Sequence, residues 1–260
     1  MDTRGRLTKD GIRIYEDADF AGMHKAGRLA AEILDRIIPH IVPGVTTAEL
    51  DEVAEKFIRS QGGVPTFKGF RGFPGSICAS PNSMVVHGIP GPYTLEKGDI
   101  LSVDIGVTLD GWVADGASTI PVGPIDETTQ KLLTVTKESL DLAAAQMVPG
   151  NRVGDIGHAV QSHVEAAGFS IIRTLVGHGV GQNMHEEPQI PNYGTPGRGP
   201  EIEEGMVFAI EPMVNVGGPH VYMDDDGWSV FSEDGSMAAH FEYTVAATAD
   251  GPRILTPWDE

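Results

Sequence analysis

The stretch that most constrains the fold is an alternating run interrupted by Asp110-Gly111. Residues 99 to 123 read DILSVDIGVTLDGWVADGASTIPVG. An Asp-Gly pair between two alternating segments is a strong short-range signal for a β-hairpin. The pattern predicts antiparallel strands over residues 100–109 and 112–122, with Asp110 and Gly111 as the two loop residues.

This register places two aspartates on one face of the hairpin. Gly106 opposes Asp115 and Asp104 opposes Ala117, so the two aspartates are diagonal neighbours. Diagonal positions lie roughly 7 to 8 Å apart at Cα, which suits two carboxylates that hold ions on the order of 3.5 to 4 Å apart. Gly106 lies between the aspartates and is expected to leave that space open.

The same alternation also allows a plain antiparallel hairpin with one solvated face. The solvated residues would then be Ser102, Asp104, Thr108 and Asp115, and the core-facing residues Val103, Ile105 and Val107. The hairpin alone does not decide between this interpretation and a metal site.

Three residues further along the chain favour the metal site. His178 lies in GHGVGQNMHEEP, Glu211 in MVFAIEPM and Glu242 in HFEYTVAAT. Both glutamates stand in apolar, strand-like runs, where a glutamate is seldom buried unless it is paired or binds metal. Four gathered carboxylates would balance two divalent ions, whereas without metal some of them would have to stay protonated.

The composition of this donor set indicates the kind of metal. Oxygen-rich coordination with one imidazole favours manganese, iron(II) or cobalt, and zinc remains open. Cys78 is the single thiol of the chain, so a cysteine-zinc site is excluded.

An internal repeat suggests how the fold is organised. VPGVTTAELDEVAEKFIRSQGG at residues 42–63 aligns without gaps with VPGNRVGDIGHAVQSHVEAAGF at 148–169. Helices are predicted over residues 17–38, 46–61, 126–147 and 153–167. Each copy of the repeat contains one of these helices, 46–61 or 153–167. The helix over 17–38 carries an apolar stripe that includes Ile37 and Ile38. Each copy is followed by strands, which predicts two related α+β halves around one shared centre.

The bulk composition limits the remaining possibilities. The chain has 260 residues, one cysteine, no long apolar run, and a start that lacks the apolar core of a signal peptide. We expect no internal disulfide, no membrane span and a cytoplasmic location. The 18 basic and 37 acidic residues argue against DNA or broad nucleic-acid binding.

From about residue 10 to the C-terminus, the chain resembles the bacterial type I methionine aminopeptidases. The stretches that carry the resemblance are TFKGFRGFPGSICASPNSMVVHGIP at 66–90, GDILSVDIGVTLDGWVADGAST at 98–119, GHGVGQNMHEEP at 177–188, IEPM and FEYT. The resemblance implies an α+β pita-bread fold, an antiparallel sheet covered by helices with the metals in its concavity. Residues 1–260 would form one catalytic domain with pseudo-symmetric halves at about 10–123 and 124–256.

The resemblance also implies an activity, the removal of the N-terminal methionine from nascent chains and peptides with a small second residue. Two divalent ions (Co, Mn, Fe(II) or Zn) would be held by Asp104 through both oxygens, by Asp115 and Glu242 as bridges, and by His178 with Glu211. A metal-bridging water or hydroxide would be the nucleophile, and Glu211 would pass the proton toward the leaving amine. The substrate's amino group would bind a metal, which fixes cleavage one residue in.

The remaining implied site residues surround the substrate. His87 would lie near the new amine and His185 near the scissile carbonyl. The methionine side chain would lie in an apolar pocket lined by Phe67, Phe70, Phe73, Cys78, Met184 and Trp228. An aromatic cluster is more often core than pocket, but three Phe residues among glycines favour a ligand-lining loop.

The chain departs from the usual family pattern beside this site. Phe70 and Phe73 stand where tyrosine is common, Met184 replaces a frequent Phe, and His240 and Tyr243 replace the usual Gln and His. These changes bear on the pocket's shape and on the surroundings of Glu242.

Three alternatives are weighed against this assignment. Xaa-Pro dipeptidases share the five ligands but usually carry an additional N-terminal domain. The type II aminopeptidases are disfavoured because 30 residues separate Glu211 from Glu242, too few for their insertion. A metal-free binding protein of the same fold would be expected to have lost ligands.

A monomer is expected, and any contact with the ribosome would be small or transient.

Overall fold

The computed structural model describes residues 4–258, so the first three and last two residues of the predicted domain lie outside it. Within these residues there are four α-helices and two short 3-10 turns, and the α-helices come in two consecutive pairs with strands before and after each pair. The helices are α1 (Asp17–Ile37), α2 (Thr47–Ser60), α3 (Glu127–Ala144) and α4 (Val153–Ala166), and the turns are η1 (Ile38–His40) and η2 (Phe70–Gly72). None of the described helices is long and apolar enough to cross a membrane.

The strands are short except for one long hairpin. In the N-terminal part they are β1 (Arg6–Leu7), β2 (Arg13–Ile14), β3 (Val64–Pro65), β4 (Cys78–Pro81), β5 (Met84–Val86), β6 (Ile100–Leu109) and β7 (Trp112–Pro121). The later strands are β8 (Ser170–Ile171), β9 (Val176–Gly179), β10 (Glu186–Pro191), β11 (Val207–Ile210), β12 (Met213–Asn215), β13 (Val221–Met223), β14 (Val230–Ser232), β15 (Ala238–His240), β16 (Tyr243–Thr248) and β17 (Gly251–Ile254).

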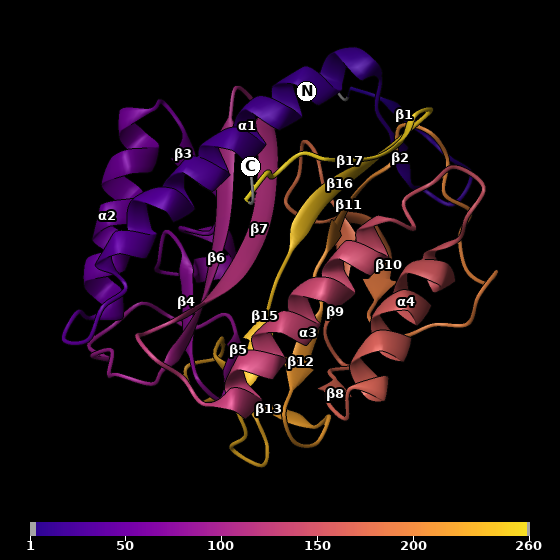
Figure 1. Ribbon diagram of the computed structural model, residues 1–260. Coiled ribbons are helices and arrows are strands. Elements are labelled where there is room, and N and C mark those ends of the chain that lie inside the picture. The colour runs from indigo at the N-terminus through magenta and orange to yellow at the C-terminus, as the bar shows by residue number, and fades with distance from the viewer. Residues whose placement is uncertain (1–3, 259–260) are drawn as a thin grey trace.

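These strands pair antiparallel in several connected sheets. β6 pairs with β7 on one edge and with β3 and β4 on the other, and a second sheet has the order β10-β9-β11-β16-β17. Two smaller sheets have the orders β15-β12-β8 and β13-β14-β5. In Figure 1, α1 and α2 flank β6 and β7, while α3 and α4 lie beside β9 to β12. The α+β prediction is confirmed.

The predicted hairpin and its register are confirmed, with the second strand ending at Pro121, one residue earlier than predicted. Gly106 pairs with Asp115 and Asp104 with Ala117, as the two-residue loop requires. Asp110 has a φ of 52° and Gly111 a φ of 85°. Positive φ at both central residues is the type I′ turn, whose twist matches that of the flanking strands.

The structure excludes the alternative of a solvated hairpin face and shows that the expectation for Gly106 is wrong. The aspartate face is not solvated, because Asp104 is 8% exposed and Asp115 is 2% exposed. The space beside Gly106 is not open either, since a Cβ at this position would lie 2.5 Å from the ring of Phe67. The glycine therefore makes room for an aromatic side chain rather than for ions.

The predicted helices form with small shifts at their ends. The side chain of Thr46 accepts a hydrogen bond from the Glu49 N–H and the Glu49 carboxylate accepts one from the Thr46 N–H, which completes the expected capping box. The stripe on α1 extends one residue less than predicted. Ile37 is fully buried but Ile38 is 41% exposed, because the helix ends at Ile37 and the chain turns into η1.

Both repeat copies have the same local structure. α2 and α4 are 14 residues long and begin and end at aligned positions, and each is followed by a two-residue strand, β3 or β8. Gly62 and Gly168 follow the helices with φ of 78° and 86°. The helices and strands of the repeat are confirmed, whereas a single domain of two related halves stays a prediction.

Backbone and side-chain hydrogen bonds join the N-terminal hairpin to the C-terminal strand β16. The Glu242 N–H donates to the Ala117 carbonyl at 2.9 Å. The Thr244 hydroxyl donates to the Asp115 carbonyl at 2.8 Å. Acidic residues far apart in the sequence are thereby brought together.

Candidate metal centre and substrate pocket

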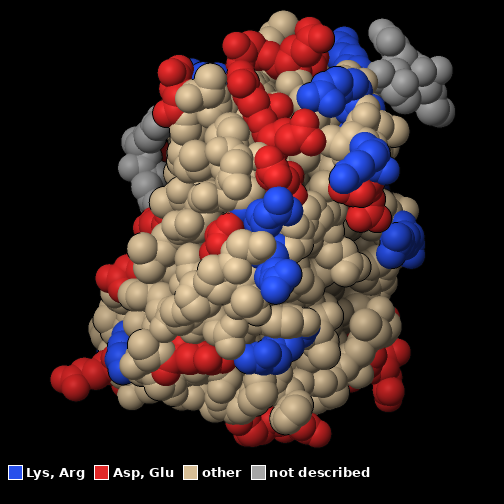
Figure 2. Space-filling model, turned by 90° about the vertical axis from the view of Figure 1, so that its right-hand side faces the viewer, with Lys and Arg blue, Asp and Glu red and all other residues tan. Residues whose placement is uncertain are grey.

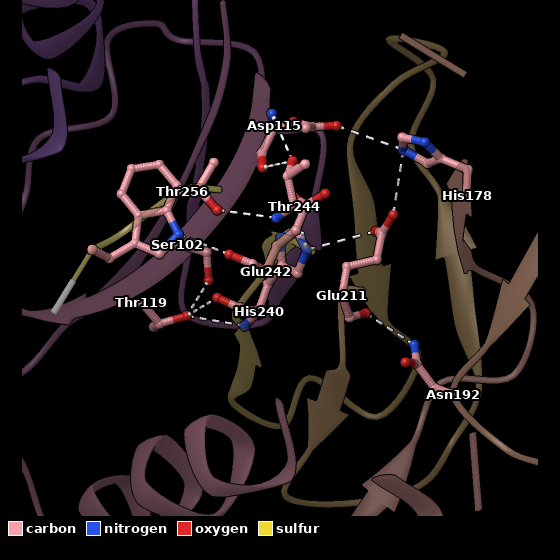
Figure 3. Close-up of polar contacts among 11 residues, drawn as sticks. Ser102, Asp115, Thr119, His178, Asn192, Glu211, His240, Glu242, Thr244 and Thr256 are labelled. Carbon is pink, nitrogen blue, oxygen red and sulfur yellow. Dashed lines mark hydrogen bonds and ion pairs between the residues drawn. The ribbon is translucent and has the colours of Figure 1, made fainter. Parts of the chain in front are cut away.

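The five predicted ligand residues line one cavity. Asp104 lies on β6, Asp115 on β7 and His178 on β9, while Glu211 and Glu242 lie at strand ends. Ligand atoms of Asp115, His178 and Glu242 lie within 4.8 Å of one another. In Figure 3, dashed lines join the ring of His178 to Asp115 and to Glu211, and join Glu211 to the ring of a second histidine, His240.

The apolar surroundings of the two glutamates predicted that both lie inside strands, and this prediction is wrong. Glu211 follows the last residue of β11, and Glu242 precedes the first residue of β16. β11 pairs with β16, whereas the adjoining β12 pairs with β15 in another sheet. Each glutamate therefore lies between two strands that belong to different sheets, Glu211 between β11 and β12 and Glu242 between β15 and β16. Pro212 favours the interruption after Glu211, because proline has no backbone N–H to donate to a neighbouring strand.

The tautomer of His178 is set by its backbone. Nδ1 lies 2.9 Å from its neighbour's carbonyl oxygen, that of Gly179, so Nδ1–H donates there. Nε2 then presents a lone pair, 3.6 Å from Asp115 Oδ2 and 3.6 Å from Glu211 Oε1. An imidazole held in this way is a ready metal ligand.

The carboxylates have the unsatisfied atoms that bound ions would need. Asp104 Oδ1, Asp115 Oδ1 and Glu242 Oε1 are buried and have no hydrogen-bond partner among residues 4–258. A buried acceptor without a partner costs free energy, so three in one cavity call for an explanation. Divalent cations fit this set, which is rich in oxygen donors and includes one neutral imidazole.

The pKa values of these groups report the same crowding. Burial, with the neighbouring carboxylates, raises the pKa of Asp115 and Glu242 well above the ordinary range. Burial also raises the pKa of Asp104 to about 7 and that of Glu211 to about 8. Burial lowers the pKa of His178 to about 4, which keeps its lone pair free at neutral pH.

All the residues expected around the substrate line the same cavity, of about 200 Å³. Phe73 packs edge-on against Phe67 at 6.4 Å and against Trp228 at 5.1 Å between ring centroids. Met184 and Cys78 are 7% and 4% exposed. Burial and the nearby carboxylates raise the pKa of the Cys78 thiol, so this side chain contributes an uncharged wall.

The two histidines expected beside the substrate also face the cavity. His185 stacks on Phe70 with ring centroids 5.4 Å apart and lies 4.2 Å from the His178 ring. His87 has a φ of 59°, uncommon for a residue other than glycine. Burial lowers the pKa of His87 to about 4, with smaller effects of His240 and His185, and the imidazole is neutral at neutral pH.

Several lining residues were not predicted from the sequence. They are Arg71, Val86, Leu175, Val176 and Met213. Val86 adjoins His87, Val176 lies on the strand of His178, and Met213 follows Glu211 by two residues. Proximity to a predicted ligand was therefore the one signal in the sequence that could have found them.

The N-terminal segment also supports the site. The Tyr15 hydroxyl lies 2.8 and 2.9 Å from the carboxylate oxygens of Glu186, the residue after His185. The Gln182 N–H donates to the same hydroxyl at 3.1 Å. Tyr15 thus anchors the loop that carries Met184 and His185, a role that its isolated position in the sequence did not indicate.

Comparisons with known proteins agree with this arrangement. The model of metallopeptidase family M24 matches residues 21–249. The chain is 51% identical to methionine aminopeptidase 1 of Bacillus subtilis (strain 168) over 234 residues, 90% of this chain and 94% of that protein.

Solved structures give the same result. The crystal structure of methionine aminopeptidase from Rickettsia prowazekii superposes with a TM-score of 0.93 at 41% identity, and covers 94% of this chain and 99% of that one. Prolidase from Pyrococcus furiosus superposes with a TM-score of 0.74 at 22% identity, over 94% of this chain and 65% of that one, a likeness of fold alone. The pita-bread prediction is confirmed. The chain belongs to metallopeptidase family M24 and, within it, to the methionine aminopeptidases.

Proposed function

We propose that the protein removes the N-terminal methionine from peptides and nascent chains whose second residue is small, in a metal-dependent hydrolysis. One observation carries the proposal. The five metal-donor residues line the same cavity as three phenylalanines, Met184 and Trp228. A metallopeptidase centre and an apolar pocket for one side chain therefore share a single cavity. Relatives that carry the name methionine aminopeptidase match over nearly the whole chain.

Asp104, Asp115, His178, Glu211 and Glu242 would hold two divalent ions. Two such ions would neutralise four buried carboxylates, whose pKa values are raised mainly by burial. Manganese, iron(II) and cobalt suit the oxygen-rich donor set best, and zinc is the next candidate. When bound, such ions polarise a peptide carbonyl and lower the pKa of a water molecule toward neutrality.

The protein's own residues would then move the proton and orient the peptide. Glu211, which lines the cavity beside His178, would accept a proton from the attacking water and deliver it to the leaving amine. His185 would donate a hydrogen bond toward the scissile carbonyl, and His87 would contact the new amine. Both imidazoles have a lowered pKa and are neutral at the working pH.

The pocket walls would select methionine by shape and polarizability. Edge-on ring contacts join Phe67 to Phe73 and Phe73 to Trp228, which gives the cavity aromatic edges. A thioether makes favourable contacts with aromatic rings, each roughly 0.3 to 1.5 kcal/mol. A charged or β-branched first residue would gain less from the same walls.

The surroundings in which this activity takes place are also proposals. We infer a cytoplasmic monomer with one domain of two related halves, and brief docking on the ribosome at most. On the face in Figure 2, basic side chains stand in small groups among acidic ones. With a formal net charge of -19, a small contact area is favoured over a broad RNA-binding face.

The test is a peptide panel with manganese-loaded protein. We expect free methionine from peptides that begin Met-Ala or Met-Gly and almost none from a matched Met-Lys peptide. Cleavage of Xaa-Pro dipeptides without release of methionine would assign a dipeptidase instead. A metal-loaded protein inert on the whole panel would indicate a binding protein that retains the fold.

A further inference from the structure

A second buried histidine, His240, faces the glutamates from the strand β15. Its backbone is clamped on both sides by Thr119, which accepts from the His240 N–H at 2.9 Å and donates to the His240 carbonyl at 2.8 Å. Because the Thr119 hydroxyl hydrogen is used there, Ser102 is the donor in the 2.8 Å contact between the two hydroxyls. These two hydrogen bonds fix the backbone of His240 and hence the position from which its side chain extends. Figure 3 shows the ring turned toward Glu211.

The ring itself is unsatisfied in spite of full burial. His240 is 1% exposed, and neither Nδ1 nor Nε2 has a hydrogen-bond partner among the described residues. Nε2 lies 3.6 Å from Glu211 Oε2 and 3.9 Å from Glu242 Oε2. A buried imidazole without partners is costly, so a shift of a few tenths of an ångström that closes one of these gaps is favourable.

The surroundings of the two ring nitrogens decide the tautomer. Nε2 faces two carboxylate oxygens, whereas Nδ1 has no acceptor within hydrogen-bond distance in the described part of the chain. When the two glutamates are charged, as metal ligands are, a hydrogen on Nε2 therefore meets acceptors, and a lone pair there would meet negative charge. This is the opposite of His178, whose Nδ1 carries the hydrogen and whose Nε2 carries the lone pair.

We propose that His240 is a positioning residue that donates a hydrogen bond from Nε2 to Glu211 Oε2 and is not itself a metal ligand. The inference rests on the proposed metallopeptidase function and adds to it a residue that holds one of its ligands. Glu211 then lies between two imidazoles of opposite tautomer, with Oε2 held by His240 and Oε1 3.6 Å from His178 Nε2. The carboxylate is thereby fixed for metal binding through Oε1.

Glutamine at position 240 provides a matched variant, because its side-chain amide keeps an N–H donor but cannot imitate an imidazole ligand. Alanine removes the donor altogether. Loss of a hydrogen-bond partner of a metal ligand typically weakens metal binding about 10- to 100-fold. We therefore expect His240→Ala to weaken Mn²⁺ binding by about that factor, and His240→Gln to stay within about 3-fold of wild type.

The experiment measures Mn²⁺ binding by calorimetry and the visible absorption of the Co²⁺-loaded protein for wild type and both variants. Thermal unfolding of the metal-free proteins shows that each variant is folded. The expected result is weakened Mn²⁺ binding in His240→Ala, recovery in His240→Gln, and Co²⁺ bands at unchanged wavelengths in all three.

Two results would overturn the inference. His240→Ala with wild-type affinity would show that the side chain holds nothing. Loss of affinity in His240→Gln together with shifted Co²⁺ bands would make His240 a ligand. Neither readout depends on peptide cleavage. A wild-type protein inert on Met-Ala peptides would contradict the proposed function, whereas the metal-binding comparison would still test the role of His240.

Discussion

Removing the divalent ions should make the stability of the folded protein fall as the pH rises from about 6.5 to about 8. Burial raises the pKa of Asp104 to about 7 and that of Glu211 to about 8, and with the neighbouring carboxylates it raises those of Asp115 and Glu242 well above their ordinary values. In the unfolded chain such acids titrate near pH ~4. The metal-free folded state therefore retains protons that the unfolded state has already released, and its advantage declines as the pH rises.

The magnitude follows from the proton count. Each carboxyl that stays protonated only in the folded state changes the free energy of unfolding by about 1.4 kcal/mol per pH unit, or roughly 2 kcal/mol across this window. Histidines act in the opposite direction at lower pH. His178 and His87 have pKa values lowered to about 4, so their contribution grows up to the unfolded value of ~6.5 and is nearly complete above it.

The assay is urea unfolding followed by tryptophan fluorescence, with a chelator or with excess Mn²⁺. We expect the free energy of unfolding to fall by several kcal/mol over this pH range in chelator and to stay level with Mn²⁺, because bound ions keep the carboxylates charged. Glu211→Gln should reduce the fall in chelator by roughly 2 kcal/mol. A metal-free protein whose stability is constant or rises between these pH values would refute the reasoning.

Three further predictions concern single residues. Asp104→Asn should lower methionine release roughly 100-fold or more with an unchanged circular dichroism spectrum, since even outer partners of metal ligands are worth about 10- to 100-fold; wild-type turnover would show that the site is misplaced. Gly106→Ala should cost ~1 to 3 kcal/mol in urea unfolding, because its Cβ would lie 2.5 Å from the Phe67 ring. Gly91→Ala, whose Cβ would meet nothing nearer than 3.7 Å, is its control, and equal costs would contradict the packing argument. Thr46→Ala should cost ~1 kcal/mol of stability through the lost cap, whereas the exposed Thr128→Ala should cost much less; equal losses would show that the cap is not the cause.

The parts of the fold that sequence predicted are those governed by local chemistry. Asp110-Gly111 specifies a turn that only residues tolerant of positive φ adopt easily, and the turn fixed the register that places Asp104 and Asp115 together. Thr46 and Glu49 specified a helix start through their reciprocal hydrogen bonds. The ligand and pocket residues came instead from resemblance to a family, and they converge on one cavity.

The features that sequence did not predict depend on contacts between distant segments. The ring that fills the space beside Gly106 comes from Phe67, in the segment between β3 and η2. Tyr15 reaches Glu186 across 171 residues, and no local pattern marks either residue as a partner of the other. Glu211 and Glu242 looked like strand residues because their neighbours are apolar, but the change of pairing partner at these positions is set by the other strands.

The most direct test of the account measures methionine release and bound metal on the same sample. The protein is stripped with chelator and then titrated with Mn²⁺, and the release of free methionine from a Met-Ala peptide is followed at each ratio of metal to protein. We expect no release without metal, recovery as the five-residue site fills with up to two ions, and no comparable recovery in Asp104→Asn. Full release by the stripped protein, or a titration that restores wild type and Asp104→Asn alike, would contradict it.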